Sequence, residues 1–242
     1  SKIALLCWKA LSLTYLGDFS SALSSLRAAV DRAGNIKHRL SEVFARTFSA
    51  IVIDAQHEFD AARRKAAAAS RLAEEETFGY WQAWNDFLWG ASESSLKVSK
   101  TSLARTHSAI RAYAKPGAKV WLPYMVFRFA GDLSRMGRDT EAETVLNRGK
   151  QLLDGEADRY YFADICCFEA EISLNLGREK SAIALLENGW RIAMQQSNLL
   201  AASHILNAAK RLKSSQGMKQ RKAWQEEISS GREIPSSISD LL

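Results

Sequence analysis

Apolar and small side chains recur at every fortieth position along this chain. Counting from Gly17, the position five residues later holds only Ala or Ser: Ala22, Ala62, Ser102, Ala142 and Ala182. Two further columns, seven residues before and twelve after, hold only Ala or Gly: Ala10, Ala50, Gly90, Ala130 and Ala170, and then Ala29, Ala69, Ala109, Gly149 and Gly189. These columns predict closely packed helix pairs, because a longer side chain would push the two backbones apart.

Each period predicts a helix, a short turn and a second helix. The first helices are expected near 2–16, 37–56, 76–92, 121–136 and 157–176, and the second near 19–33, 59–74, 98–114, 139–153 and 179–196. Gly at 17, 137 and 177 can end a helix in the left-handed conformation. His57 and Lys97 stand where Gly would, so we expect the second and third turns to be built differently. The expected N-caps are Asp18, Asp139 and either Asp154 or Asp158, and Pro123 suits a first helical turn.

Neither helix of a unit can bury its apolar stripe alone, so the units must stack. The predicted fold is all-α, a right-handed α-α superhelix of five to six repeats in a single domain, 1–242. The repeats are expected near 1–35, 36–75, 76–115, 118–155 and 156–197, followed by a more polar capping repeat at 198–229 and a tail at 230–242. The chain lacks an initiator Met and begins within a repeat, so we expect it to be part of a longer polypeptide.

Composition supports a helical fold. The chain has 36 Ala against 13 Gly and 3 Pro, too few turn residues for a β-sandwich, a barrel or a doubly wound sheet. No window approaches the ~20 apolar residues of a membrane span, and no signal peptide is recognisable. Three cysteines, Cys7 and the pair Cys166-Cys167, form no disulfide framework, so we expect a cytoplasmic protein with packed thiols. The net charge of +6 is scattered and demands no acidic partner.

Motifs that would carry chemistry are missing from the sequence. The four histidines, His38, His57, His107 and His204, have no zinc-ligand spacing. Neither a GxxxxGK[ST] phosphate loop nor a GxSxG nucleophile motif occurs. We therefore predict no catalytic residue, no metal and no cofactor, and expect the chain not to be an enzyme.

The turns resemble those of tetratricopeptide repeats. Leu16–Ala22, Met136–Ala142 and Leu176–Ala182 are similar to the L-G-[DR]-x-x-x-A turn of that family. The family's common repeat is shorter than the one found in this chain. Longer repeats are typical of the helical C-terminal regions of bacterial signalling proteins, either class III adenylate cyclases joined to an AAA-type ATPase or MalT-like transcription activators.

Four stretches resemble the cyclase–ATPase group more closely: Tyr80–Trp84, Gly117–Tyr124, Asp158–Asp164 and Ile234–Leu241. The chain departs from that group at Asp164–Cys167, where a charged sequence is usual. The cyclase and ATPase motifs themselves are absent, so the resemblance carries no nucleotide chemistry over to this chain.

In the tetratricopeptide pattern, two columns of the first helices face a concave groove. Here they hold Ala4, Phe44, Trp84, Tyr124 and Asp164, and Cys7, Thr47, Phe87, Phe127 and Cys167. The resemblance thus implies six candidate partner-binding residues: Phe44, Trp84, Phe87, Tyr124, Phe127 and Arg128. The alternative is that these rings pack between adjacent units. The groove is too apolar for a clamp that grips a peptide carboxylate.

The resulting functional expectation is a non-catalytic scaffold that binds a protein partner or other domains of its own polypeptide. Two alternatives stay open. Basic groups at Arg63–Lys65 and between Lys210 and Lys222 could contact nucleic acid. A small-molecule sensor in the groove is what a MalT-like resemblance would allow.

Overall fold

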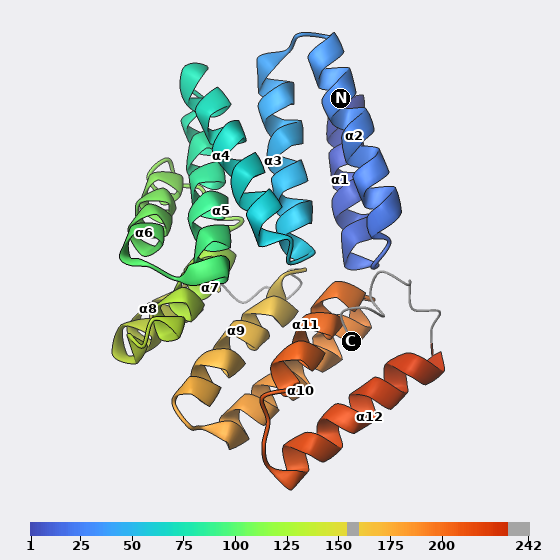
Figure 1. Cartoon of the computed structure of the whole chain (residues 1–242), viewed down its shortest axis with the longest axis vertical. Coiled ribbons are helices and arrows are strands. Elements are labelled where there is room, and N and C mark those ends of the chain that lie inside the picture. Colours follow the sequence, from blue (N-terminus) through green and yellow to red (C-terminus); the bar gives the residue numbers. More distant parts are fainter. Residues whose placement is uncertain (154–159, 232–242) are drawn as a thin grey trace.

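A computed structural model describes residues 1–153 and 160–231, and this part of the chain is helical throughout (Figure 1). It contains twelve helices and no strand. Their bounds are α1 Lys2–Tyr15, α2 Phe19–Asn35, α3 Arg39–Ala55, α4 Phe59–Glu75, α5 Gly79–Lys97, α6 Lys100–Ala114, α7 Leu122–Arg135, α8 Asp139–Gln151, α9 Phe162–Asn175, α10 Glu179–Gln195, α11 Leu199–Ala209 and α12 Ser215–Gly231. The expected helices are confirmed to within a few residues, except that α5 runs five residues further than expected and α9, expected from 157, begins at Phe162.

The helices form an α-α solenoid, as predicted. Each odd-numbered helix packs on the helix that follows it and on the next odd-numbered helix, from α1 and α3 through to α9 and α11. Figure 1 shows the path turning back on itself, with α11 beneath α1. Helices α1 and α11 are in contact. The odd-numbered helices therefore surround the inside of the curve.

The columns of small residues lie where backbones meet, which confirms their predicted role. Every member of the column that begins with Ala22 is fully buried. A Cβ atom built on Gly90 would lie 2.4 Å from Oγ1 of Thr106, and one on Gly149 would lie 2.8 Å from the Phe127 ring. No real Cβ tolerates such distances, so these helix pairs need glycine.

The turns recur at every twentieth position, half the period seen in the sequence. Left-handed backbone occurs at Gly17, Lys37, His57, Thr77, Gly117, Gly137, Gly177 and Ser197. The expectation that His57 changes the second turn is wrong, since His57 has φ = 60° and Glu58 donates back to the carbonyl of Ile53, as in a Schellman cap. The third turn does differ: α5 continues to Lys97, and Ser99 starts α6 with a capping box.

Two of the expected caps can be compared with the structure. Asp18 is an N-cap and accepts a hydrogen bond from the Ser21 amide at 3.0 Å. Asp139 is not a cap: it is the first residue of α8, and its carboxylate accepts from the Ser134 hydroxyl instead. Asp154, Asp158 and the tail beyond 231 lie outside the described residues.

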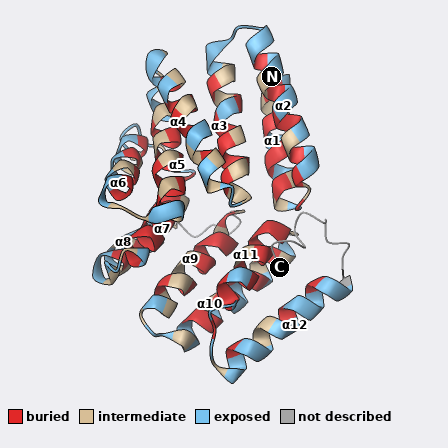
Figure 2. Ribbon diagram, in the orientation of Figure 1, coloured by how far each residue is buried: buried red, intermediate tan, exposed pale blue. Residues whose placement is uncertain are grey.

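The far end of the solenoid is closed by α12. Trp224 and Ile228 of α12 are buried, and the Trp224 ring stacks on Trp190 of α10 with 5.2 Å between ring centroids. The opposite side of α12 is exposed (Figure 2) and carries residues such as Lys219 and Lys222. This polar helix matches the capping repeat expected at 198–229.

Candidate functional site

The inside of the curve holds a chamber of about 280 Å³. Its lining comes mostly from four columns of the odd-numbered helices: Trp84, Tyr124, Asp164 and His204; Leu88, Arg128 and Phe168; Leu11, Ile51 and Glu171; and Tyr15, Ala55, Ser95 and Arg135. Along one helix, the four columns follow each other at intervals of four, three and four residues. Residues at these intervals lie on the same face of an α-helix. The chamber is thus built from the same helix face in successive units.

The two ends of the solenoid meet beside the chamber. The ring of Tyr15, at the end of α1, lies 5.2 Å from the ring of Tyr160, which precedes α9. Phe19 forms a small buried cluster with Leu199 and Leu200 of α11. Three lining residues, His57, Arg135 and Asn207, are exposed and mark the mouth of the chamber. A small molecule fits such a space, but a peptide helix does not.

A buried ion pair crosses the chamber wall. The Arg128 guanidinium of α7 donates to both carboxylate oxygens of Asp54 in α3, with an Nη2–Oδ1 distance of 3.0 Å. Both side chains are almost fully buried. Burial opposes the charge on Arg128, but Asp54, Tyr124 and Asp132 together outweigh burial and hold the pKa of Arg128 well above its usual value.

Neighbouring hydroxyl groups satisfy the remaining atoms of this pair. Ser92 of α5 donates to Asp54 at 2.6 Å, while Arg128 donates to the Tyr124 hydroxyl at 3.1 Å and to the Ser95 hydroxyl at 3.4 Å. The network links the second, third and fourth units. A buried pair with satisfied polar atoms orients side chains, whereas removing one partner would leave an uncompensated charge.

Two histidines far apart in sequence stack beside the chamber. The rings of His57 and His204 are 4.4 Å apart and nearly parallel. Nδ1 of His204 lies 3.1 Å from a carboxylate oxygen of Asp164, and its Nε2 is buried without a hydrogen-bond partner. Partial burial, and then His204, lower the pKa of His57 to about 4.

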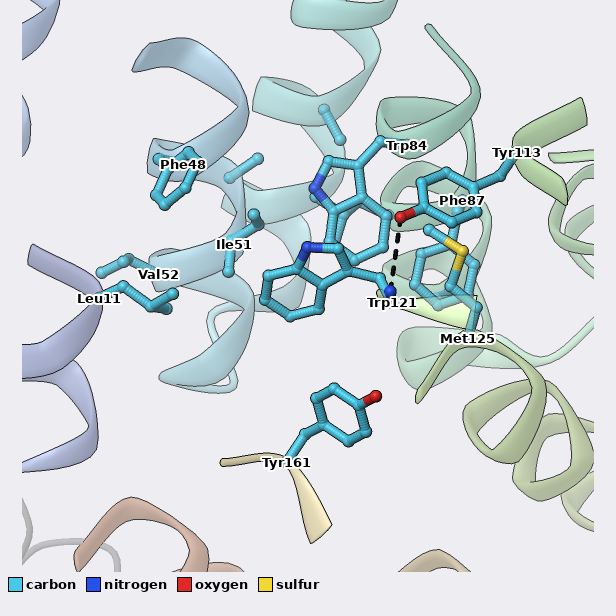
Figure 3. Close-up of a cluster of buried hydrophobic side chains, with 14 of the residues drawn as sticks. Leu11, Phe48, Ile51, Val52, Trp84, Phe87, Tyr113, Trp121, Met125 and Tyr161 are labelled. Atoms are coloured by element: carbon cyan, nitrogen blue, oxygen red, sulfur yellow. Dashed lines mark hydrogen bonds between the residues drawn. The ribbon is translucent and has the colours of Figure 1, made fainter. Parts of the chain in front are cut away.

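Aromatic rings form the apolar wall (Figure 3). Trp84 lies 5.0 Å from Trp121 between ring centroids, as Figure 3 shows for these two side chains. Outside that view, the Tyr124 ring lies 6.0 Å from the Phe168 ring. The Tyr113 hydroxyl behind them accepts a hydrogen bond from the Trp121 amide at 3.4 Å. Burial raises the pKa of the Tyr124 phenol to about 12, so this hydroxyl stays protonated at neutral pH.

The structure places three of the six predicted binding residues, Trp84, Tyr124 and Arg128, in the chamber lining. Trp84 is nevertheless 2% exposed and belongs to the core, as the alternative interpretation held. Phe44 does not line the chamber: it is half-buried between Phe48 and Trp81.

The prediction that the column beginning with Cys7 faces the groove is wrong for Phe87 and Phe127. Both are 0% exposed and belong to the core, whereas Cys167 of the same column does line the chamber. Residues one position further along, such as Leu88 and Arg128, turn toward the chamber instead.

Sequence reasoning missed Asp54, His57 and His204 as parts of one site. His204 does continue the column of Trp84, Tyr124 and Asp164 by one more period, which was an available signal. The contact of His57 with His204 depends on how the solenoid closes, and no periodicity in the sequence carries that information.

A second candidate site is the end face of α1, formed by Leu5, Trp8 and Ser12. The column of Leu5 continues with Ala45, Asn85, Met125, Ile165 and Ile205. These five are at most 1% exposed because they face the preceding unit, whereas Leu5 is 70% exposed. Trp8 is 48% exposed, against 2% for its counterpart Phe48. The end face is therefore a stacking surface that no other element among residues 1–153 and 160–231 covers.

Other candidate chemistry is sparse. Cys7, Cys166 and Cys167 are free and buried, and burial raises the pKa of the Cys166 thiol to about 11. Within residues 1–153 and 160–231, no cluster of three His, Cys, Asp or Glu side chains is arranged to hold a metal ion. In the same part of the chain, no helix has the length and apolarity that crossing a bilayer requires.

The fold and the two sites define a helical-repeat protein with a small interior chamber and, within the described residues, an apolar face of α1 that no other helix covers. No protein-family model matches the chain, and no curated protein matches its sequence.

Proposed function

We propose that this chain is a non-catalytic interaction module that docks an amphipathic helix, supplied by a partner protein or by another domain of its own polypeptide, on the end face of α1. The observation that carries the proposal is the exposure of Leu5 at a position that is buried in every later unit. In those units, a helix of the preceding repeat covers this position. A docked helix would continue the same packing.

The chemistry of the docked helix follows from the interface it would extend. Inside the solenoid, α2 and α4 supply this packing with small buried residues such as Ala33, Ala69 and Ala73. Helix α1 contains Lys2 and Lys9, both exposed, and no acidic residue. The partner helix should therefore combine a stripe of small residues with flanking Asp or Glu.

Selection from a displayed library of helical peptides tests this proposal. Selected helices should share a small-residue stripe and acidic flanks, and should lose at least about tenfold in affinity for the Leu5→Asp variant. Leu96→Asp is the matched control, since Leu96 is another exposed leucine, on α5, at 51% exposure against 70% for Leu5. Helices that bind both variants as well as they bind the parent chain would contradict the proposal.

We propose that the parent molecule is a bacterial multidomain signalling protein. This rests on the turn motifs and the long repeat period, which resemble those of cyclase- or transcription-regulator-associated helical regions. In a longer polypeptide that carries an output domain, a docked helix should raise the activity of that domain. The Leu5→Asp variant should lose this stimulation. An output that ignores the docked helix would count against the proposal.

The chamber favours a second candidate function, small-molecule sensing. Its size suits a metabolite, and its mouth is open at His57 and Arg135. A thermal-shift panel of metabolites should raise the melting temperature for at least one compound. If no compound of any class raises the melting temperature, small-molecule sensing is contradicted. The proposal for the end face of α1 does not depend on this result.

The nucleic-acid alternative gains no support from the geometry. Arg63 and Arg64 both pair with Asp60 on α4. Figure 1 places α4 in the upper half of the molecule, far from α12, which carries Lys219 and Lys222. The two basic groups do not form one surface.

A further inference from the structure

The charges in the chamber do not balance. The lining contains three carboxylates, Asp54, Asp164 and Glu171, and two guanidinium groups. Asp54 is neutralised by Arg128. Arg135 pairs with Asp132 outside the lining and lies 4.0 Å from Glu171. This leaves excess negative charge on α9, with Asp164 bonded only to a histidine among the contacts described.

Hydrogen bonding at His204 points to a ligand that donates. An ionised carboxylate can only accept, so the bond between Asp164 and His204 must be donated by the Nδ1–H of His204. In a neutral imidazole, Nε2 then carries a lone pair. That Nε2 is buried and has no partner. Because Nδ1 and Nε2 lie on opposite sides of the ring, the Asp164 carboxylate is the acceptor on the chamber side that a ligand can share with His204.

The rest of the lining suits the apolar body of a cation. Trp84, Trp121 and Tyr124 form a continuous wall, with 5.0 Å between the first two rings and 6.3 Å between the last two. Burial raises the pKa of the Tyr15 and Tyr124 phenols, and the nearby charge of Asp164 raises both further. Aromatic faces attract organic cations and also bury apolar groups. An anionic ligand would be repelled by the carboxylates of the lining.

We propose that the chamber binds a small primary amine in its ammonium form, with the ammonium group at the Asp164 carboxylate and a compact apolar body against Trp84, Trp121 and Tyr124. The volume of about 280 Å³ limits the ligand to the size of a small metabolite. A primary ammonium is preferred over a quaternary one because it can donate a hydrogen bond to the Asp164 carboxylate. This inference rests on the second candidate function, small-molecule sensing.

Calorimetric titration at about pH 8, where imidazoles are neutral, tests the proposal with three probes of similar shape. These are 2-phenylethylamine, 2-phenylethanol and 3-phenylpropanoate, which are cationic, neutral and anionic. The amine should bind at least about tenfold more tightly than the alcohol, and the anion should bind least. Asp164→Asn should remove the preference for the amine, whereas Asp31→Asn, on the exposed side of α2, should leave it unchanged.

Glu171→Gln provides an independent variant if Asp164→Asn fails to fold, and should weaken amine binding by about threefold. An amine that binds no more tightly than the alcohol overturns the proposal. Tighter binding of the anion would overturn the ligand class while leaving sensing intact. Failure of all three probes to bind also overturns the ligand class, and the metabolite panel then decides whether sensing survives.

Discussion

The two ends of the solenoid are finished in different ways. At the C-terminal end, α12 buries Trp224 and Ile228 against the preceding helices and turns a polar side outward. At the N-terminal end, α1 leaves Leu5 and Trp8 uncovered at positions that are buried in later units. Repeat arrays need polar outer faces where they stop. Among the described residues, the α12 end has such a polar outer face and the α1 end does not, so the α1 face is suited to packing against a further helix.

The largest expected effect is at the capped end. Trp224→Ala removes a ring that is 3% exposed, stacked on Trp190, and should lower the free energy of unfolding by about 3–5 kcal/mol. Urea denaturation measures this. A loss below about 1 kcal/mol would show that α12 is not needed to close the array.

The α12 cap is one of the features of the fold that can be predicted from the sequence. Helix positions, small-residue columns and the polar last repeat all follow from periodicity, because each depends on contacts between neighbouring units. Lys37, Thr77 and Ser197 adopt left-handed turns despite an unfavourable propensity, since the packing of the flanking helices overrides it.

The candidate sites were only partly predictable. Trp84, Tyr124 and Arg128 line the chamber as the tetratricopeptide resemblance implied, while Phe87 and Phe127 point into the core. A one-residue difference in register decides between the two environments. The joining of the ends at the chamber depends on small rotations summed over all units, which no single repeat encodes.

The contacts between paired helices should be packed equally closely in the first and fourth units. Ala142→Leu adds a bulky side chain at a fully buried contact between α7 and α8 and should destabilise by about 1–3 kcal/mol. Ala22→Leu, the same column in the first unit, should behave similarly. Thermal melts compare the two. A much smaller effect at Ala22 would mean that the α1 end is loosely packed as well as uncovered.

A third test uses pH at the place where the ends meet. The pKa of His57 is lowered to about 4 in the folded chain, against about 6.5 when unfolded, so its neutral form favours folding above pH 6.5. This contribution is lost as pH falls from about 6.5 to 4. Because His57 is partly open to solvent, we expect a loss of only about 1 kcal/mol.

The matched variant is His57→Asn, because Asn tolerates the left-handed backbone at this position. Asp132 acts in the opposite direction: burial raises its pKa to about 6, so its contribution to stability is lost as pH rises through that value. Denaturation curves of both proteins between pH 7 and 4 separate the two groups. Equal pH dependence in the parent chain and in His57→Asn would contradict the assignment.

The smallest expected effect is at the uncovered end. Leu5→Ala should change the free energy of unfolding by less than about 0.5 kcal/mol, since most of the side chain already faces water. Ile205→Ala, in the same column but fully buried, should cost about 2–5 kcal/mol. A comparably large loss for Leu5→Ala would mean that the chain already covers this end, for example by self-association, and sedimentation at several concentrations would then detect the second copy. A small loss, together with weakened capture of the docked helix, would show that Leu5 serves binding rather than folding.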